Sequence, residues 1–475
     1  MYTAACPSCG APVSFRSAAS VMAVCEYCQS TLLRNADEIK DIGKMSSALE
    51  DYSRIQIGTS GQYQGQGFNV VGRIQLRYDA GFWNEWYLFF DDGSAAWLAD
   101  ASGQYMLTKS LGAAVDAPAF ANIQPDMAYL YDKRSYVFSD VRTAQYVSGA
   151  GELPFTVGKG YVAKVVDARH AARFITLDYS QGAPELFVGE AVNLADLKCQ
   201  LLRSDDQITE SAGRLAGKNN VLDCPSCASP LKYIAGMAMQ LVCPACHMEV
   251  DCAGDKAIAI GKARQLEAFH STLQLGDTAT IENKKWLLIG LMRCSEEGEV
   301  DGDWTEYLLY HASLGFMWLV ESQQGWDQIE VLNQWPEMHN AAQAMLNGKK
   351  YRKLFDYNAH FTYAAGAFNW RVHVGDKTAL TDYDLNGVRL SKERSPSEVT
   401  WSRAKRISSE LVGQWFAKPI ASFASGDASP SSIKSLAIMF TALLVVINLP
   451  LLIFNGFGGI WLLFFALVLV WLPAR

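Results

Sequence analysis

Aromatic and β-branched residues gather in short runs along the first half of the chain, and turn residues separate the runs. Residues 68–74, 85–90 and 161–166 are three such runs, and each predicts a β-strand. An Asp-Asp-Gly sequence at 91–93 predicts a hairpin turn, with the returning strand over 95–99. Short strands joined by turns are typical of a barrel or a sandwich rather than of alternating strands and helices.

A short segment ahead of these strands has helical spacing instead. Ile39, Ile42, Met45 and Leu49 fall near one face of a helix, so residues 36–54 are predicted to be helical. Such a helix would either bind a partner or connect two domains by packing on the second one. We favour the connector.

The C-terminal part of the chain is almost entirely apolar. Residues 436–454 carry no charge, and a helix of this length crosses a hydrocarbon layer of about 30 Å. A Gly-rich turn at 455–459 leads into a second apolar run at 460–472. Because Lys434 and Arg475 flank the pair, we predict a transmembrane hairpin with both ends in the cytoplasm. The alternative is one span followed by an interfacial segment.

The chain is a tandem duplication. With an offset of 218, Cys6 maps to Cys224 and Gly72 maps to Gly290. Three further pairs match at an offset of 221, after a short insertion: Trp83 with Trp304, Glu85 with Glu306, and Trp97 with Trp318. The chain therefore consists of two copies of about 215 residues followed by a tail, and this repeat predicts the number of domains better than the chain length alone does.

Eight of the eleven cysteines form two sets with one spacing. Each set has two C-x2-C pairs separated by fifteen residues. The two-residue gap lets a tight turn direct both sulfurs at one ion, which predicts a four-thiolate zinc site in a small ribbon. The predicted ligands are Cys6, Cys9, Cys25 and Cys28 in the first copy and Cys224, Cys227, Cys243 and Cys246 in the second.

Two structural zinc ions are therefore expected, and iron in a rubredoxin-like site is the alternative. The first residues have no basic region and no apolar run, so no secretory signal is predicted and thiols are expected to stay reduced. Cys199, Cys252 and Cys294 are then ordinary thiols, although Cys252 follows Cys246 closely enough to compete for the ion. His247 also follows Cys246, but four cysteines already complete a site.

Net charge argues against nucleic-acid binding. The total is −8, and removing the two positive charges of Lys434 and Arg475 leaves −10 for the rest of the chain. Proteins that bind nucleic acid show a basic patch, because affinity for phosphate comes largely from Lys and Arg. No nucleic-acid partner is therefore expected, and a nucleic-acid-binding ribbon stays the least favoured function.

Both copies also contain distinctive short motifs outside the cysteine pairs. In the first copy they are Ile57-Gly58-Thr59, Gly72-Arg73, Trp83-Asn84-Glu85-Trp86-Tyr87-Leu88, Asp92-Gly93 and Trp97-Leu98. In the second copy they are Trp370-Arg371-Val372-His373-Val374-Gly375-Asp376, Leu390-Ser391-Lys392-Glu393 and Glu398-Val399-Thr400-Trp401-Ser402. These motifs resemble a bacterial family known as domain of unknown function 4178, and the resemblance implies no established activity. It implies a context of zinc ribbons, membrane helices, polyamine-synthesis enzymes, small membrane proteins and membrane-stress proteins of the phage-shock type.

No catalytic constellation is found, so the protein is not expected to be an enzyme. A closed four-thiolate site leaves no open position for Lewis-acid chemistry, and the chain has no Gly-x-Ser-x-Gly and no phosphate-binding loop. The candidate binding surface is aromatic: Trp83, Trp86 and Trp97 with Glu85, echoed by Trp304, Tyr307 and Trp318 with Glu306. These residues could form a cage for an organic cation such as a polyamine, and core packing is the simpler interpretation.

The sequence thus predicts a mainly β protein with two modules, each a zinc ribbon plus a barrel-like or sandwich-like domain, and a C-terminal transmembrane hairpin. The predicted segments are ribbon 1–35, helix 36–54, β domain 55–200, linker 201–222, ribbon 223–252, helix 253–272, β domain 273–412, flexible linker 413–432 and hairpin 433–475. The predicted function is a cytoplasmic adaptor, anchored in the bilayer of the bacterial inner membrane, that recruits membrane-stress or other membrane proteins. The alternatives are polyamine binding and nucleic-acid binding.

Overall fold

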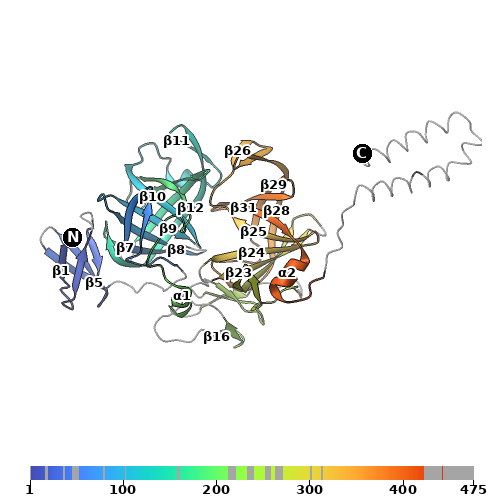
Figure 1. Cartoon of the computed structure of the whole chain (residues 1–475), viewed down its shortest axis with the longest axis horizontal. Helices are drawn as coiled ribbons and strands as arrows, with labels where there is room; N and C mark the ends of the chain where they lie inside the picture. The colour runs from blue at the N-terminus through green and yellow to red at the C-terminus, as the bar shows by residue number, and fades with distance from the viewer. Residues whose placement is uncertain are drawn as a thin grey trace, which may run out of the picture. The chain divides into compact units, whose positions relative to one another are not determined.

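The computed structural model describes residues 2–16, 20–35, 38–44, 53–78, 81–101, 103–157, 161–211, 221–232, 240–251, 258–262, 271–299, 302–311, 314–421 and 441. Residues Met1–Ile420 form one compact unit and Ala421–Arg475 form a second. All strands that the structure describes belong to the first unit (Figure 1).

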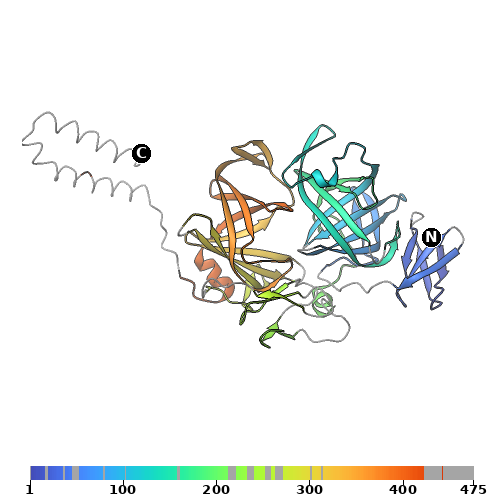
Figure 2. The same cartoon turned by 180° about the vertical axis from the view of Figure 1, so that it is seen from behind.

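Eight strands of the first copy close into a barrel. They pair antiparallel in the order β12-β13-β14-β15-β10-β9-β8-β7, and β7 pairs back with β12 (Figure 2). Closure leaves no free edge in the barrel wall. The bounds are β7 Gln66–Arg77, β8 Phe82–Phe90, β9 Ala95–Ala101, β10 Gln104–Ala113, β12 Arg134–Leu153, β13 Val162–His170, β14 Arg173–Asp178 and β15 Glu185–Val192. The flanking elements are β6 Ser60–Tyr63, η1 Phe120–Asn122 and β11 Ala128–Tyr131.

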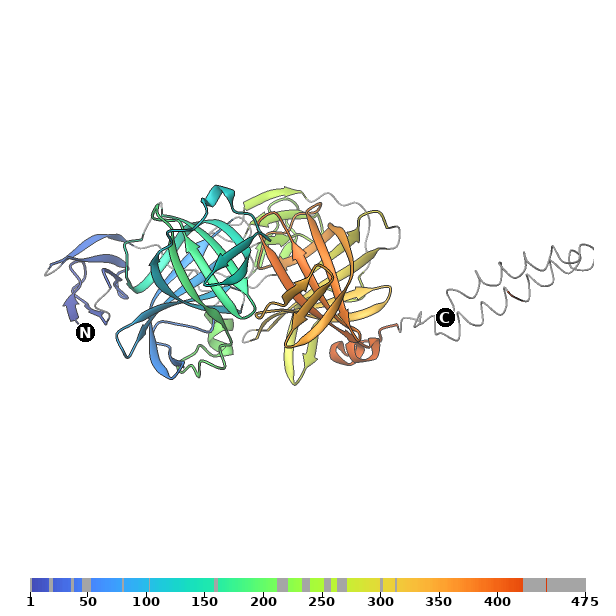
Figure 3. The same ribbon diagram turned by 90° about the horizontal axis from the view of Figure 1, so that it is seen from above.

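The second copy repeats this barrel. Its strands pair in the order β28-β29-β30-β31-β25-β24-β23-β22, and β22 pairs back with β28 (Figure 3). The bounds are β22 Lys284–Glu296, β23 Asp303–His311, β24 Gly315–Ser322, β25 Gly325–Val331, β28 Lys349–Phe368, β29 Lys377–Leu385, β30 Val388–Arg394 and β31 Val399–Ile407. The flanking strands are β21 Thr278–Ile281, β26 Glu337–Asn340 and β27 Gln343–Leu346. The predicted mainly β fold is confirmed in the stronger form of closed barrels.

Each ribbon extends the sheet of its barrel. In the first copy, β5-β4-β3 continues from β12, beside a separate pair β1-β2. In the second, β20-β19-β18 continues from β28, beside the pair β16-β17. The bounds are β1 Tyr2–Ala5, β2 Pro12–Phe15, β3 Met22–Val24, β4 Ser30–Asn35, β5 Glu38–Lys44, β16 Val221–Asp223, β17 Pro230–Lys232, β18 Gln240–Val242, β19 Met248–Asp251 and β20 Ile258–Lys262.

A glycine allows one long strand to serve both the barrel and the ribbon. Strands β12 and β28 are each 20 residues long. Near their ends Gly151 has φ 68° and Gly366 has φ 95°. A Cβ at Gly151 would lie 2.2 Å from the carbonyl oxygen of Val71, and one at Gly366 would lie 2.3 Å from that of Ile289. Only glycine combines this left-handed backbone with so close an approach.

The predicted connector helices are wrong where the structure describes them. Residues Glu38–Lys44 form strand β5, which pairs with β4, and Ile258–Lys262 form strand β20, which pairs with β19. In each ribbon the neighbouring strand, β4 or β19, offers unpaired backbone groups at its edge. Pairing with that edge favours a strand more than the weak helical spacing favours a helix, because strand formation depends on the neighbouring strand. The other residues of 36–54 and 253–272 lie outside the described part, except 53, 54, 271 and 272, which are not helical.

Two helices occupy segments that were predicted to be linkers. Helix α1, Asp205–Ser211, lies in the linker between copies, where Ile208 is fully buried. Helix α2, Ser409–Phe416, begins at the cap Ser408, whose hydroxyl accepts a hydrogen bond from the backbone N–H of Leu411. The flexible linker therefore does not begin at 413, because α2 continues to Phe416 and buries that side chain.

The predicted transmembrane hairpin at 433–475 lies outside the described residues, apart from Thr441. Within the part of the chain that the structure describes, no helix has both the length and the apolar character needed to cross a bilayer.

Candidate metal centres and barrel interiors

Four tight turns of one design present the predicted metal ligands. In each turn, the residue after the second cysteine donates its backbone N–H to the carbonyl oxygen of the first cysteine, at 2.8 to 2.9 Å. That residue has a left-handed backbone in every case: Gly10, Gln29, Ala228 and His247. The spacing C-x2-C therefore closes a turn that directs two sulfurs to one side.

The sulfur atoms meet as the spacing predicts. In the first ribbon, Cys6 Sγ lies 3.6 Å from Cys28 Sγ, and Cys9 Sγ lies 3.7 Å from Cys25 Sγ. The corresponding distances in the second ribbon are 3.5 and 3.7 Å. All four sulfurs of each set lie within 4.8 Å of one another. A tetrahedral ion with metal–sulfur bonds of about 2.3 Å needs sulfurs about 3.8 Å apart, so both clusters could hold a metal ion.

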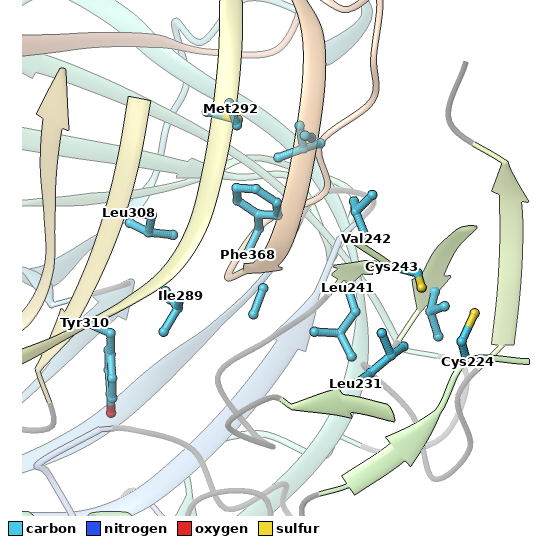
Figure 4. Packing of buried hydrophobic residues seen from close by; sticks show 14 residues of the cluster. Cys224, Leu231, Leu241, Val242, Cys243, Ile289, Met292, Leu308, Tyr310 and Phe368 are labelled. Carbon is cyan, nitrogen blue, oxygen red and sulfur yellow. The ribbon is translucent and has the colours of Figure 1, made fainter. Parts of the chain in front are cut away.

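The ribbon of the second copy shares a hydrophobic core with its barrel. Cys224 and Cys243 belong to the same buried cluster as Ile289 and Phe368 of the barrel strands. Figure 4 shows Leu231 and Leu241 of the ribbon between these sulfurs and the barrel residues. A metal in this ribbon would therefore hold together a surface on which the barrel also packs.

The first ribbon is attached differently. Cys6 and Cys25 cluster with ribbon residues only, whereas Met22 and Val24 pack with Ile74 of the barrel. The buried carboxylate of Glu152, near the end of β12, also fastens this ribbon. It accepts hydrogen bonds from the backbone N–H of Arg16 at 2.6 Å and from Ser20 Oγ at 3.0 Å.

The remaining candidate thiols and histidines lie elsewhere. Cys199 is half-buried and Cys294 is buried, and neither belongs to a four-cysteine cluster. His247 lies 5.8 Å from the Tyr363 ring, measured between ring centres, and is not among the clustered ligands. Cys252 lies outside the described residues.

Carboxylates from separate strands meet inside the first barrel. The charges of Asp167 on β13 and Asp178 on β14 help to raise the pKa of Glu85 on β8, although β8 does not neighbour either strand. Side chains of non-neighbouring strands come together only across the interior, so all three point inward. Cross-strand pairing puts Trp83 and Trp97 on this inner face as well.

Glu85 is poised between its neutral and charged forms. Burial raises its pKa to about 8, against an opposing hydrogen bond from Trp83, and Asp167 and Asp178 add to the rise. Trp83 Nε1 donates that hydrogen bond to Glu85 Oε1 at 2.8 Å. Near neutral pH the carboxyl group is therefore mostly protonated, and a positive charge beside it would favour the carboxylate.

Asp167 has a hydroxyl partner and no cationic one. Burial raises its pKa to about 6, and Thr176 Oγ1, which donates to Asp167 Oδ1 at 2.7 Å, opposes the rise. Among the described residues, no Lys, Arg or His lies within ion-pair distance of Glu85, Asp167 or Asp178. The interior of this barrel therefore holds three carboxyl groups without a salt bridge.

The two arginines nearest these carboxyl groups are engaged elsewhere. Arg142 pairs with Asp140 at 2.5 Å and with Glu398 of the second copy. Arg169 lies 5.1 Å from the Phe174 ring and 5.4 Å from the Trp335 ring, and donates to the carbonyl oxygen of Asn333 at 3.3 Å. Both act on Asp167 only from a distance, by lowering its pKa.

The predicted aromatic surface divides between two faces of the wall. Trp97 contacts Tyr87 and Phe155 at ring-centre distances of 4.9 and 5.9 Å on the inner face. Trp86 lies on the opposite face, where it is buried beneath the Arg73 guanidinium at 5.0 Å. Trp86 therefore packs in a core, and Trp83 and Trp97 share the interior with Glu85.

The second barrel keeps the same hydrogen-bonded carboxyl groups. Trp304 Nε1 donates to Glu306 Oε1 at 2.8 Å, as Trp83 does to Glu85. Ser391 Oγ donates to Asp382 Oδ1 at 2.6 Å, and the strand pairing makes this pair equivalent to Thr176 and Asp167. Burial raises the pKa of Glu393 to about 8, with Glu306 adding to the rise.

In the second barrel, arginines pair directly with two of the interior carboxylates. Arg389 Nη2 lies 3.2 Å from Asp327 Oδ2, and Arg389 Nε lies 3.7 Å from Asp382 Oδ2. Arg406 Nε lies 3.2 Å from the other oxygen of Asp327. Two buried carboxylates are thereby paired with the chain's own guanidinium groups.

Sequence reasoning found the two glutamates but missed Asp167, Asp178, Asp382, Glu393 and Arg389. They lie on β13, β14, β29 and β30, and only barrel closure brings these strands opposite the strands of Glu85 and Glu306. Comparison of the two copies could have revealed them, because acidic residues occupy equivalent positions in both. Asp167 on β13 corresponds to Asp382 on β29, and Asp178 on β14 corresponds to Glu393 on β30.

A hollow of about 270 Å³ lies outside these interiors, lined by Asp126, Asp356 and Lys392 among others. Most of its charges are already paired, since Lys392 pairs with Asp126 at 2.5 Å and Asp356 pairs with Lys353 at 2.5 Å. The barrel interiors are therefore the stronger candidates for a ligand site.

Comparison with known families matches residues 56–194 and 274–409 to the family described as Domain of unknown function (DUF4178). The matched residues make up more than half of the chain, and the chain belongs to this family, as its motifs predicted. No curated protein and no solved structure matches the chain.

Proposed function

We propose that the first barrel binds a small organic cation in its interior. The observation that carries this proposal is the set of three inward carboxyl groups, Glu85, Asp167 and Asp178, without an ion-pair partner among the described residues. An unpaired charge inside a protein is costly, and a cationic ligand would remove that cost by pairing with it.

The size and lining of the barrel support a ligand of this kind. An eight-stranded barrel has an interior wide enough either for side chains alone or for one small ligand. Glu85 and Asp167 are only half-buried by accessible surface, although burial dominates both pKa values. Side chains that border an enclosed space are expected to show both partial accessibility and a pKa dominated by burial. Trp83 and Trp97 add aromatic faces that attract cations.

Titration of the purified full chain with spermidine tests the proposal, with tryptophan fluorescence as the readout. We expect a saturable change that weakens at least tenfold in Glu85→Gln and in Asp167→Asn, because each variant removes a charge from the site. Glu306→Gln is the matched control in the second copy and should bind as the wild type does. No response up to about 10 mM, a range typical of weak ligands, or an equal response in Glu85→Gln would refute the proposal.

We also propose that the four-cysteine clusters hold structural zinc. Small ribbons have little core, so metal binding would supply much of their folding free energy. Metal analysis should find two zinc ions per chain, and Cys6→Ser should leave one. Iron with the visible absorption of a thiolate complex would establish the rubredoxin-like alternative instead.

The adaptor role expected from the sequence stays a prediction. It depends on the membrane hairpin at 433–475, which lies outside the described residues. Crosslinking in native membranes, followed by affinity purification, tests it. A specific membrane-protein partner would support it, and none in repeated experiments would count against it.

A further inference from the structure

We propose that Arg389 is an internal ligand of the second barrel, and that its guanidinium group takes the place that the first barrel leaves to an external cation. The proposal deepens the cation-binding function, on which its statement about the first barrel rests. According to this proposal, the chain has one binding site for a cation, which lies in the first barrel. The ligand would resemble an arginine side chain in having a cationic head and an apolar stem.

Contacts in the second interior show how such a cation is held. The Arg389 guanidinium contacts Asp327 at 3.2 Å and Asp382 at 3.7 Å. Both carboxylates are buried, with 4% and 1% of their residue surface exposed. Ser391 Oγ engages the Oδ1 atom of Asp382 and leaves Oδ2 for the guanidinium. The hydroxyl–carboxylate pair therefore works here as one half of a cation site.

The first barrel keeps this half-site and lacks the arginines. Asp167 and Thr176 are equivalent to Asp382 and Ser391. Cross-strand pairing shows that the positions of Arg389, Arg406 and Asp327 are taken by Phe174, Ala191 and Met106. The carboxylate thus remains while apolar side chains occupy these three positions, and Arg169, which stacks on Phe174 at 5.1 Å, makes no ion pair with Asp167 among the described residues.

These replacements define the chemical class of the ligand. A cationic head would pair with Asp167, and an apolar stem would contact Met106, which is 4% exposed, beside the Phe174 ring that Arg169 covers. Aliphatic guanidinium and ammonium compounds have this form, as arginine and lysine side chains do. An anion does not fit an interior with unpaired carboxyl groups.

Chemical rescue tests the internal ligand directly in the full chain. Arg389→Ala should lower the melting temperature by roughly 5–10 °C, because it leaves buried carboxylates without their partner. Methylguanidinium at about 10 mM, a concentration suited to a weak small-molecule site, should restore at least half of this loss. Urea at the same concentration should restore none. Arg293→Ala removes a more exposed ion pair with Asp303, and it should gain nothing from methylguanidinium.

Stoichiometry gives a second readout. Native mass spectrometry with methylguanidinium should show one bound cation in the wild type and two in Arg389→Ala. If Arg389→Ala does not fold, Arg389→Lys serves instead. It should fold because it keeps the charge, and it should bind one cation because the position stays filled.

The outcomes separate the two proposals. Full stability of Arg389→Ala, or a loss that methylguanidinium restores no better than urea, would overturn the internal ligand. Two cations bound to the wild type would also overturn it and would leave the cation-binding function standing. Rescue of Arg389→Ala beside a wild type that binds nothing would support the internal ligand and refute the function proposed for the first barrel.

Discussion

In the first barrel, Asp167 accepts a hydrogen bond from Thr176 and has no salt bridge among the described residues. In the second, the equivalent Asp382 accepts one from Ser391 and also pairs with Arg389. The two interiors share a framework of carboxyl and hydroxyl groups, and they differ in whether an arginine pairs with the aspartate. Duplication therefore preserved the backbone and the hydrogen bonds, whereas the substitutions that add or remove an arginine beside the aspartate fall on a few inward positions.

A second difference concerns the ribbons. Cys243 shares a buried cluster with barrel residues such as Phe368, and its equivalent Cys25 clusters only with residues of its own ribbon. The same four-cysteine cluster is thus part of the barrel core in one copy and more separate in the other.

The largest expected effect comes from removing one metal ligand. Cys243→Ser should lower the free energy of unfolding by more than about 3 kcal/mol, because loss of the ion also loosens the core shared with the barrel. Cys25→Ser should lose its ion with a smaller loss of barrel stability. Thermal unfolding followed by tryptophan fluorescence, with metal content measured alongside, checks this. Equal losses in the two variants would show that the ribbons are coupled to their barrels alike.

Neutralising the equivalent aspartates should have opposite effects. Asp382→Asn should cost about 2–4 kcal/mol, since it removes one partner of the buried Arg389. Asp167→Asn should be neutral or stabilising without ligand, because it removes a buried carboxyl group that has no cation. Denaturant unfolding measures both values. Destabilisation of the two variants by the same amount would mean that Asp167 already has a hidden partner.

Titration of Glu85 gives a pH-dependent test. Its pKa is raised by burial from the ordinary 4.5 to about 8, so its contribution to stability is complete below pH 4.5 and is lost as the pH rises through 8. Binding of a cation should show the reverse trend and tighten over the same range, because the charged form pairs with the ligand. Glu85→Gln should remove this part of both pH dependences, measured by melting temperature and by spermidine titration between pH 6 and 9.

The smallest expected effect lies in the tight turns of the ribbons. Gly10 has φ 76° and its equivalent Ala228 has φ 59°. Gly10→Ala should cost about 1 kcal/mol, and Ala228→Gly should stabilise by up to about 1 kcal/mol, because only glycine adopts this conformation without strain. Chemical denaturation of the metal-loaded protein checks both signs. A loss in Ala228→Gly would show that the turn is held mainly by the metal.

The metal clusters could be predicted almost completely from the sequence. Each C-x2-C turn is local, and the two ribbons repeat one spacing, so ligand identity did not depend on the rest of the fold. The strands around Phe68, Trp86 and Val166 were also evident, because alternation and turn residues are short-range signals. The connector helices failed because Glu38–Lys44 pairs with a strand whose position is set by tertiary structure.

By itself, the sequence determined the duplication, the two four-cysteine clusters, the family and the mainly β class. Tertiary structure alone decided that each sheet closes into a barrel, since closure requires β12 and β28 to pair with strands far away in the sequence. It also decided that Glu85 and Asp167 face each other while Trp86 faces away. Strand alternation gives two faces, and only closure determines which of them becomes the inside.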